Sequence, residues 1–258
     1  MKIALSGKGG VGKTTIAGTL CRLFGRKGYE VFAIDDDPNP NLAVVLGIAG
    51  NQEPPLLKGA LLEKYQDEEG RNRVRLDTTV DELFRAQGMA APDNVTLLMV
   101  GKPEHAGTGC MCSSHAVVRE VVHAAVSETD RITVLDMEAS LEHMKRGTAK
   151  YVDTLFIVVE PYYRSLEAAN RIHTLAQELG IPRTAVIANK VRSDEDREAI
   201  EQFCTRNGLT LRAIIPFDEA FAAAEREGRP VIDLGLSSVA VARLDALADE
   251  ILSEQPAA

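Results

Sequence analysis

Short runs of consecutive apolar residues alternate along the chain with longer runs whose apolar residues recur every three or four positions. The short runs are typical of strands buried on both faces of a parallel sheet, and the longer runs are typical of amphipathic helices. The predicted strands are Lys2–Leu5, Val31–Ile34, Val95–Val100, Ile132–Leu135, Thr154–Val159, Ala185–Ala188 and Leu211–Ile215. The predicted helices are Lys13 to about Gly25, Ser113–Ser127, Ser165–Leu179, Asp194–Asn207, Asp218–Glu227 and Ser238–Ser253. The pattern predicts an α/β fold with a mainly parallel β-sheet flanked by helices.

The alternation continues through all 258 residues, so we expect a single domain spanning residues 1–258. One segment, Asn51–Asp93, departs from it, because it is rich in charge and is interrupted by prolines and glycines. Such composition predicts a variable insertion of short helices and loops at residues 51–93, near the functional site.

Composition excludes several classes of partner. The formal net charge is -9 and the pI is near 5.2, which argues against non-specific nucleic-acid binding and against attraction to anionic lipid. No apolar run approaches the length that spans a membrane, and the first predicted strand begins too early for a signal peptide. We therefore expect a cytoplasmic protein with neither nucleic acid nor membrane as partner.

The segment Gly7–Thr14 carries the strongest chemical signal, because its Gly-x-x-x-x-Gly-Lys-Thr spacing lies between a predicted strand and a predicted helix. In such a loop the backbone N–H groups surround a polyphosphate, the lysine contacts the terminal phosphates, and the hydroxyl holds Mg²⁺. The full spacing disfavours the alternative of a plain glycine-rich turn. ATP is the expected ligand, with ADP as product, and the fold is predicted to be that of a P-loop NTPase. The loop residues expected to bind the nucleotide are Gly9, Gly10, Val11, Gly12, Lys13, Thr14 and Thr15.

A second lysine, Lys8, stands at the second position of this loop. A side chain there points away from the phosphates of its own subunit, so it has a clear use only if it reaches a nucleotide held by a second subunit. We therefore expect a homodimer on ATP binding, with Lys8 and Lys13 both acting in catalysis.

Acidic residues follow two of the predicted strands. Asp35, Asp36 and Asp37 come after Val31–Ile34, and Asp136 comes after Ile132–Leu135. Ligands of open parallel sheets bind beyond the carboxyl ends of the strands, where such groups can support Mg²⁺ and orient water. The sequence predicts a magnesium site at Thr14, Asp37 and Asp136. Asp37 is the expected catalytic residue, Asp35 its alternate, and ordinary turn residues the competing interpretation.

Two later strand ends are candidates for contacts with the base. Asn189 and Lys190 follow Ala185–Ala188, and an asparagine amide there can read a purine. Pro216 and Asp218, which flank Phe217 after the last strand, are expected to present backbone groups to the base.

Cys110 and Cys112 form a second constellation, in a glycine-rich connection just before a predicted helix. In extended backbone, residues two apart point to the same side, and a helix N-terminus favours thiolate, the form that binds metal. Because soft tetrahedral sites take four ligands, a twofold dimer that supplies two cysteine pairs is the simplest completion. A site that includes His105 and His115 is one alternative, and purely structural cysteines are another.

The remaining cysteines, Cys21 and Cys204, fall in helical patterns and are predicted to be buried apolar residues.

The loop Gly7–Thr15 resembles the deviant Walker A loop of dimeric ATPases that include the nitrogenase iron protein and the Min and Par positioning proteins. Together with several later runs the chain looks like the CooC branch of that superfamily, the nickel-insertion accessory ATPases of carbon monoxide dehydrogenase. These runs are Cys110-Met111-Cys112, residues 136–143, Arg146-Gly147-Thr148, Glu160-Pro161, Asn189-Lys190-Val191 and Ile215-Pro216-Phe217-Asp218.

The resemblance implies that ATP draws two subunits together and that Lys8 contacts the partner's nucleotide. It also implies that four interface cysteines hold Ni²⁺ or Zn²⁺ and that carbon monoxide dehydrogenase is the client. Two residues depart from the family pattern: Ser140 stands where glycine is common, and Glu138 is not universal at its position. The rival functions are an iron–sulfur electron donor like the nitrogenase iron protein and a Min or Par type of positioning ATPase.

Overall fold

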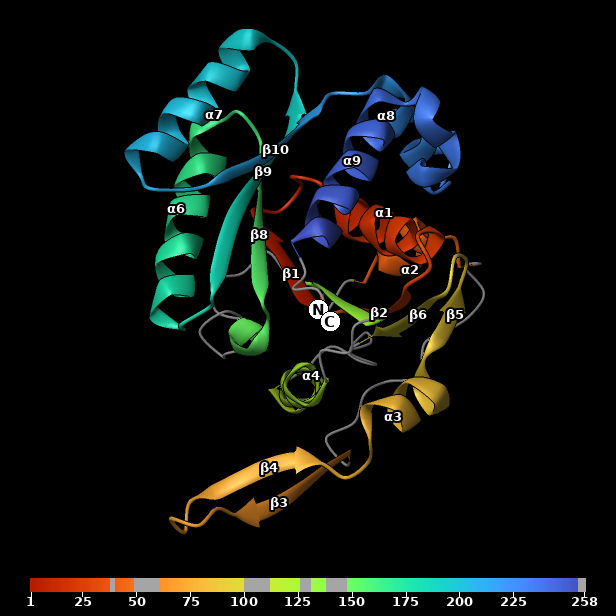
Figure 1. Cartoon of the computed structure of the whole chain (residues 1–258), viewed down its shortest axis with the longest axis vertical. Coiled ribbons are helices and arrows are strands. Elements are labelled where there is room, and N and C mark those ends of the chain that lie inside the picture. The colour runs from red at the N-terminus through yellow and green to blue at the C-terminus, as the bar shows by residue number, and fades with distance from the viewer. Residues whose placement is uncertain (38–39, 49–60, 100–111, 126–130, 138–147, 255–258) are drawn as a thin grey trace, which may run out of the picture.

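The computed structural model describes residues 1–37, 40–48, 61–99, 112–125, 131–137 and 148–254 (Figure 1). Within these ranges no helix is both long enough and apolar enough to cross a membrane.

The core element is an eight-stranded sheet with the order β10-β9-β8-β1-β7-β2-β6-β5. Seven strands run parallel, and the edge strand β5 pairs antiparallel with β6. All seven predicted strands are present, which confirms the predicted mainly parallel α/β architecture. Their bounds are β1 Lys2–Gly7, β2 Glu30–Asp35, β5 Met89–Ala91, β6 Val95–Met99, β7 Arg131–Asp136, β8 Thr154–Val159, β9 Arg183–Val191 and β10 Leu211–Pro216.

Helices cover both faces of the sheet, and alternate residues of each strand pack against one layer or the other (Figure 1). In β1, Ala4 joins the core under α3, α4, α6 and α7, while Ile3 and Leu5 join the core under α1, α2 and α9. Burial on both faces explains why these strands are continuous apolar runs. The helices are α1 Lys13–Arg26, α2 Leu42–Leu46, α3 Val80–Gln87, α4 Cys112–Ala124, α6 Tyr163–Glu178, α7 Asp194–Arg206, α8 Glu219–Arg226 and α9 Val239–Ser253, with 3₁₀ turns η2 Thr148–Tyr151 and η3 Val231–Ser237.

The expected insertion differs from its prediction as short helices and loops. Residues 61–91 contain an antiparallel hairpin, β3 Leu62–Gln66 with β4 Asn72–Leu76, followed by α3 and β5. The hairpin lies beside α4, and only its base residues Leu62 and Leu76 pack against the core (Figure 1). Since most of its side chains face solvent, the hairpin lacks the apolar run by which the other strands are recognised.

Helix α1 is fixed against the loop between β5 and β6 by a buried cation. Arg22, 5% exposed, donates to the Asp93 carboxylate at 2.7 Å and lies 3.0 Å from a carboxylate oxygen of Asp233. One turn further along α1, the backbone of Gly25 passes so close to Asp93 that a Cβ there would overlap the Asp93 carbonyl oxygen. The close approach therefore requires glycine at position 25.

We expect Gly25→Ala to destabilise the fold by about 1–3 kcal/mol, because overpacking against backbone outweighs the roughly 1 kcal/mol by which alanine favours a helix over glycine. Urea denaturation measures the free energy of unfolding. Gly18→Ala, also in α1, is the matched control, since its Cβ would meet side-chain atoms of Val45 on the short helix α2. A Gly25→Ala protein as stable as the wild type would contradict the close approach.

Candidate functional site

The phosphate loop connects β1 to α1 at the edge where the parallel strands end, as the sequence predicts. Gly12 precedes α1 with φ 93°, a conformation that favours glycine. A Cβ on Gly12 would also lie 2.5 Å from the side-chain nitrogen of Asn189. That Asn189 nitrogen donates to the Val11 carbonyl at 2.8 Å, so β9 holds the loop from the side.

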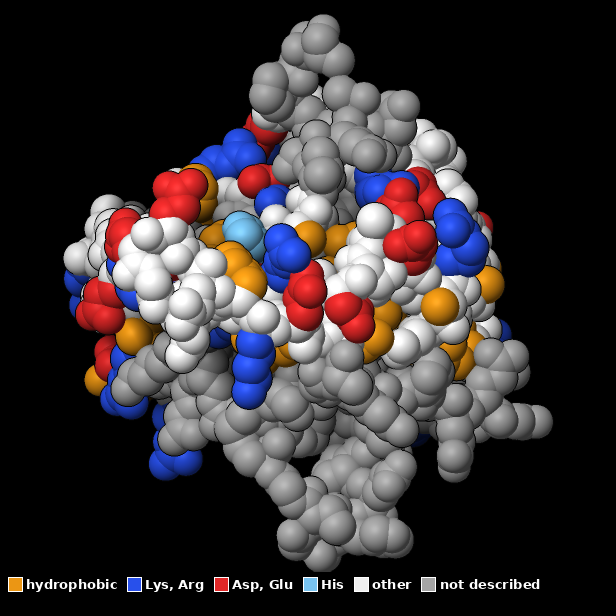
Figure 2. All heavy atoms as spheres, turned by 90° about the horizontal axis from the view of Figure 1, so that it is seen from below, with side chains coloured by type: hydrophobic (Ala, Val, Ile, Leu, Met, Phe, Trp, Pro, Cys, Tyr) orange, Lys and Arg blue, Asp and Glu red, His pale blue; other side chains and the backbone are white. Residues whose placement is uncertain are grey.

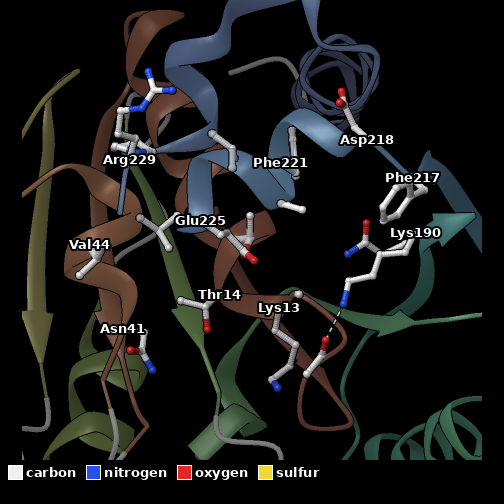
Figure 3. A pocket seen from close by; sticks show the side chains of 18 of the residues that line it. Lys13, Thr14, Asn41, Val44, Lys190, Phe217, Asp218, Phe221, Glu225 and Arg229 are labelled. Carbon is white, nitrogen blue, oxygen red and sulfur yellow. Dashed lines mark hydrogen bonds between the residues drawn. The ribbon is translucent and has the colours of Figure 1, made fainter. Parts of the chain in front are cut away.

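The loop has a second brace from the next residue of β9. Lys190, itself at φ 59°, donates to the Gly10 carbonyl at 2.8 Å and pairs with Glu160 at 2.7 Å (Figure 3). Asn189 and Lys190 thus both line the pocket and both contact the loop backbone, and Lys190 also pairs with Glu160. A contact of either residue with a base stays a prediction.

The two loop lysines take different directions. Lys13 begins α1, is 8% exposed and donates to the Lys8 carbonyl at 3.5 Å. The Lys8 side chain is exposed and lines a separate hollow beside α6, together with Tyr163 and Arg171. Lys13 therefore serves the pocket of its own chain, whereas Lys8 lies outside it, which is the arrangement expected if Lys8 acts on another subunit.

Asp35 and Asp136 end the neighbouring strands β2 and β7 and lie directly opposite each other in the sheet register. Both are almost fully buried. Asp35 accepts hydrogen bonds from the backbone N–H groups of Asp37, Asn41 and Leu42 at 3.1, 3.1 and 2.9 Å. Its carboxylate therefore organises the loop after β2, and the half-buried Asp37 lies within that loop.

Burial raises the pKa of both carboxyl groups. The pKa of Asp136 rises to about 8, chiefly because burial disfavours its charge and secondly because Asp35 is close, while a hydrogen bond from Thr14 and the charge of Lys13 oppose the rise. Burial likewise raises the pKa of Asp35 to about 6. A cation bound next to these two carboxyl groups would lower their pKa values and so favour their charged forms.

The donor set fits Mg²⁺. The Thr14 hydroxyl and the Asp136 carboxyl are hydrogen-bonded to each other, and the other carboxyl oxygen, Oδ1, is buried without a hydrogen-bond partner among the described residues. A hard cation that keeps several waters needs only one or two such oxygens in addition to phosphate. The described part of the chain contains no group of three or more His, Cys, Asp or Glu side chains arranged to hold a metal ion.

A cavity of about 700 Å³ extends from the loop to the C-terminal helices, large enough for a nucleotide (Figure 3). It is lined by Gly10, Gly12, Lys13, Thr14 and Thr15 from the loop, and by Asn189, Lys190, Pro216 and Asp218 among the candidates for the base. Among the described residues of the insertion, 61–93, none lines this cavity.

Asp218 has a clear structural use. Its carboxylate accepts from the Ala220 N–H at 2.9 Å, which caps α8, and from the Ser238 hydroxyl at 2.6 Å, which ties α8 to the start of α9. These bonds hold the pKa of Asp218 below its usual value against the opposing effect of burial. The carboxylate is therefore committed to the pocket wall, and a contact of the backbone groups of this turn with a base stays a prediction.

Side chains that are not among the predicted site residues also line the pocket, and four of them are polar or aromatic groups with clear contacts or charge: Arg192, Phe217, Glu225 and Arg229. The guanidinium of Arg192 lies 3.4 Å from the centre of the Phe217 ring, forming a flat wall. The Thr15 hydroxyl donates to Glu225 at 2.8 Å, and Arg229 lies nearby (Figure 3). Arg192 comes two residues after Lys190 and Phe217 stands between Pro216 and Asp218, so sequence proximity indicates both, whereas Glu225 in α8 and Arg229 just after it are placed only by the packing of the fold.

Several predicted residues lie outside the described residues: Cys110, His105, Glu138 and Ser140. Cys112 is the first residue of α4, with its side chain outside the description, as is that of His115. Cys21 and Cys204 are buried and free, which confirms the prediction that they are core residues.

The buried Asp136 generates a test that needs no ligand. The folded protein binds the Asp136 proton more tightly than the unfolded chain does, so the protonated carboxyl favours folding. This contribution to the free energy of unfolding is fully present below pH 3.8 and is lost as the pH rises through about 8. We expect the wild type to lose stability relative to Asp136→Asn over that interval, measured by urea denaturation at a series of pH values. A constant difference between the two proteins would show that Asp136 titrates as in water.

Known proteins share both the sequence and the fold. A family model described as the CobQ/CobB/MinD/ParA nucleotide binding domain matches residues 2–231. The carbon monoxide dehydrogenase accessory protein CooC of Rhodospirillum rubrum is 38% identical over 244 residues, covering 91% of this chain and 90% of that protein. An uncharacterized ATP-binding protein of Methanocaldococcus jannaschii is 38% identical over 235 residues, covering 90% of this chain and 91% of that protein.

Among solved structures, the cell division ATPase MinD of Pyrococcus furiosus superposes with a TM-score of 0.71 at 23% identity, covering 98% of this chain and 99% of that one. This likeness confirms the predicted P-loop NTPase fold. With the family model across residues 2–231 and the identity to CooC across nine tenths of the chain, the protein is a CooC-type ATPase of the CobQ/CobB/MinD/ParA nucleotide-binding family.

Proposed function

We propose that this protein is an ATP-dependent maturation factor that dimerises on ATP binding and assists nickel insertion into carbon monoxide dehydrogenase. The observation that carries the proposal is the 38% identity to the carbon monoxide dehydrogenase accessory protein over nearly the full length of both chains. The nucleotide pocket and the Cys110-x-Cys112 pair supply the two chemistries that this function needs.

In the proposed hydrolysis the residues position groups and neutralise charge. Lys13 binds the terminal phosphates, Thr14 and Asp136 hold Mg²⁺, and Asp37 orients the attacking water and supports the cation. Bound Mg²⁺ would screen the negative charge of the β- and γ-phosphates. The proximity of Thr14 to Asp136 and the engagement of Asp35 with backbone N–H groups support this division of roles.

Lys8 is proposed to act across a homodimer interface. Its exposed side chain lies outside the nucleotide cavity of its own chain, which supports a contact with the partner's phosphates. A cation supplied by another subunit contributes on the order of 10³–10⁵ to the rate of phosphoryl transfer in comparable systems. Hydrolysis would therefore require dimer formation and would be coupled to it.

The transported metal, Ni²⁺ or Zn²⁺, is proposed to bind Cys110 and Cys112 of both subunits. Helix α4 lies between β6 and β7 in the chain, and β6 ends at the same edge of the sheet as β1, which leads into the phosphate loop. That Cys112 is the first residue of α4 supports a cysteine pair on the same edge as the phosphate loop. ATP binding there would change how two cysteine pairs face each other, and with it the affinity for metal.

The rival functions fit less well. An iron–sulfur electron donor like the nitrogenase iron protein would use cysteines from separate segments, whereas this pair is separated by one residue. A brown absorption band in anaerobically purified protein would favour that alternative. A positioning ATPase would need a basic face for DNA or a membrane-binding helix, and α9 carries aspartate and glutamate on its polar side.

Replacing each of the two loop lysines should have a different effect on ATP binding and on ATP hydrolysis. Lys13→Ala should abolish tight ATP binding, because it removes the phosphate contact within the subunit. Lys8→Ala should retain ATP binding but lose ATP-driven dimerisation and slow hydrolysis by about 10³-fold or more. Equilibrium nucleotide binding, sedimentation and phosphate release measure the three properties.

Lys2→Ala at the opposite end of β1 is the control for the loss of a lysine and should behave as the wild type. Normal dimerisation and turnover by Lys8→Ala would refute the role of this residue across the interface.

The metal site predicts a stoichiometry. One Ni²⁺ or Zn²⁺ should bind per dimer, because each chain offers two thiolates and a soft tetrahedral site takes four. Replacing Cys110 and Cys112 with serine should remove the metal and the maturation activity while ATP binding persists. Metal affinity should also fall as the pH falls, since protons compete for the thiolates.

Metal analysis by mass spectrometry, with equilibrium dialysis for affinity, tests these expectations. Cys204→Ala is the matched control and should keep the metal, because Cys204 is buried in α7. One tight metal ion per monomer, or full metal binding by the double serine variant, would rule out the shared cysteine site and favour one that contains histidine.

A further inference from the structure

A second cavity, of about 810 Å³, lies between the β3–β4 hairpin, the C-terminal half of α4 and η2. Figure 2 shows the molecule from the side on which the hairpin lies, with blue and orange side chains grouped around a pale blue histidine. We call this cavity the hairpin groove. It is lined by Lys64, Tyr65, Asn72, Arg73, Val74, Arg119, Glu120, His123, Lys150 and Tyr151.

The hairpin groove is separate from the nucleotide pocket. The two cavities have no lining residue in common. Since η2 directly precedes β8, the groove lies near the edge where the parallel strands begin, whereas the phosphate loop lies where they end. A ligand in the groove would therefore leave ATP access to its own pocket unobstructed.

The charge of the groove is opposite to that of the whole chain. Four cationic side chains and one carboxylate line it, in a protein whose formal net charge is -9. The carboxylate, Glu120, is 8% exposed and is already paired, 3.1 Å from Arg119 and 3.6 Å from His123. Lys64 is exposed and forms no ion pair with any described residue. Arg73 is paired at 3.0 Å with Asp67, which lies outside the groove lining, so the positive charge that the described residues leave unpaired is that of Lys64 and Lys150.

Aromatic surfaces accompany these cations. The rings of His123 and Tyr151 lie with their centroids 4.2 Å apart, and the Lys150 ammonium lies 5.6 Å from the Tyr151 ring centre. Tyr65 on the hairpin is 40% exposed. Flat apolar surfaces next to cations suit a ligand that carries both carboxylates and apolar or aromatic groups.

We propose that the hairpin groove binds an acidic, aromatic-containing peptide segment of a partner protein, independently of nucleotide. Charge complementarity draws the segment to Lys64 and Lys150, and the rings of Tyr65 and Tyr151 provide apolar contact. The inference rests on the groove alone and holds whether or not the proposed role in nickel insertion is correct.

A short acidic peptide fits better than a nucleic acid. The turn at the tip of the hairpin carries Asp67, Glu68 and Glu69, so the basic surface ends within one strand length. A long polyanion leaving the groove would meet these carboxylates and then the acidic remainder of the protein, which repels it. A short segment can remain within the positive region.

The test uses the full-length protein and a fluorescein-labelled peptide of alternating glutamate and tyrosine, with binding followed by fluorescence anisotropy. The charge reversal Lys64→Glu with Lys150→Glu should weaken binding by at least about tenfold, because two attractions become repulsions. Binding to the wild type should also weaken as salt is raised, and ATP should leave it unchanged.

The matched control is Arg183→Glu with Arg197→Glu, which makes the same change in net charge at exposed positions away from the groove and should retain at least most of the affinity. Unchanged ATP hydrolysis by both double variants verifies folding, and the milder Lys64→Ala with Lys150→Ala replaces the reversal if that variant misfolds.

An equal loss of peptide affinity in the control variant would overturn the proposal. The proposal would also be overturned if a single-stranded oligonucleotide bound more tightly than the peptide at the same salt concentration and lost that binding in the charge-reversal variant. That result would assign the groove to nucleic acid.

Discussion

Every part of the nucleotide site depends on the central position of β1 between β8 and β7. Because the strands are parallel, the end of β1 delivers the phosphate loop to the same edge at which β2 and β7 deliver Asp35 and Asp136. The other half of the sheet brings β9 and β10 to that edge, with the groups that brace the loop and line the wall of the pocket. No single segment contains the site, so the order of strands assembles it.

The same geometry buries two carboxyl groups at a cost in free energy that a bound cation would reduce. Two carboxyl groups end adjacent strands in a buried position; burial raises the pKa of both, and Asp35 raises that of Asp136 further. Asp35 offsets part of this with three backbone hydrogen bonds, but Asp136 has only Thr14 and the nearby Lys13. Burial disfavours the charged form of Asp136, and a bound cation would stabilise that form. Cation binding and protonation would therefore compete for the carboxyl oxygens of Asp136.

Sequence patterns predicted those features that are determined locally or by the rule of parallel sheets. Thr154–Val159 matches β8 residue for residue, because both of its faces are buried and its apolar run ends at polar neighbours. The hairpin was missed because it is mostly exposed, and α2 because five residues are too few to show a period. Within the site, strand ends and loop spacing predicted Thr14 and Asp136. The packing of Arg192 on Phe217 and the hydrogen bond from Thr15 to Glu225 depend on contacts across the fold, which no local pattern encodes.

The two braces from β9 have a consequence for how tightly an anion can be held. Asn189 and Lys190 hold the carbonyl oxygens of Val11 and Gly10 from outside the loop and so fix its backbone before any phosphate binds. Ordering a backbone residue opposes binding by about 1–2 kcal/mol, and here that ordering is accomplished during folding. Because the loop is preorganised, the free energy of its contacts with phosphate is not offset by the cost of ordering the loop. It can therefore contribute fully to affinity and to stabilisation of the transition state.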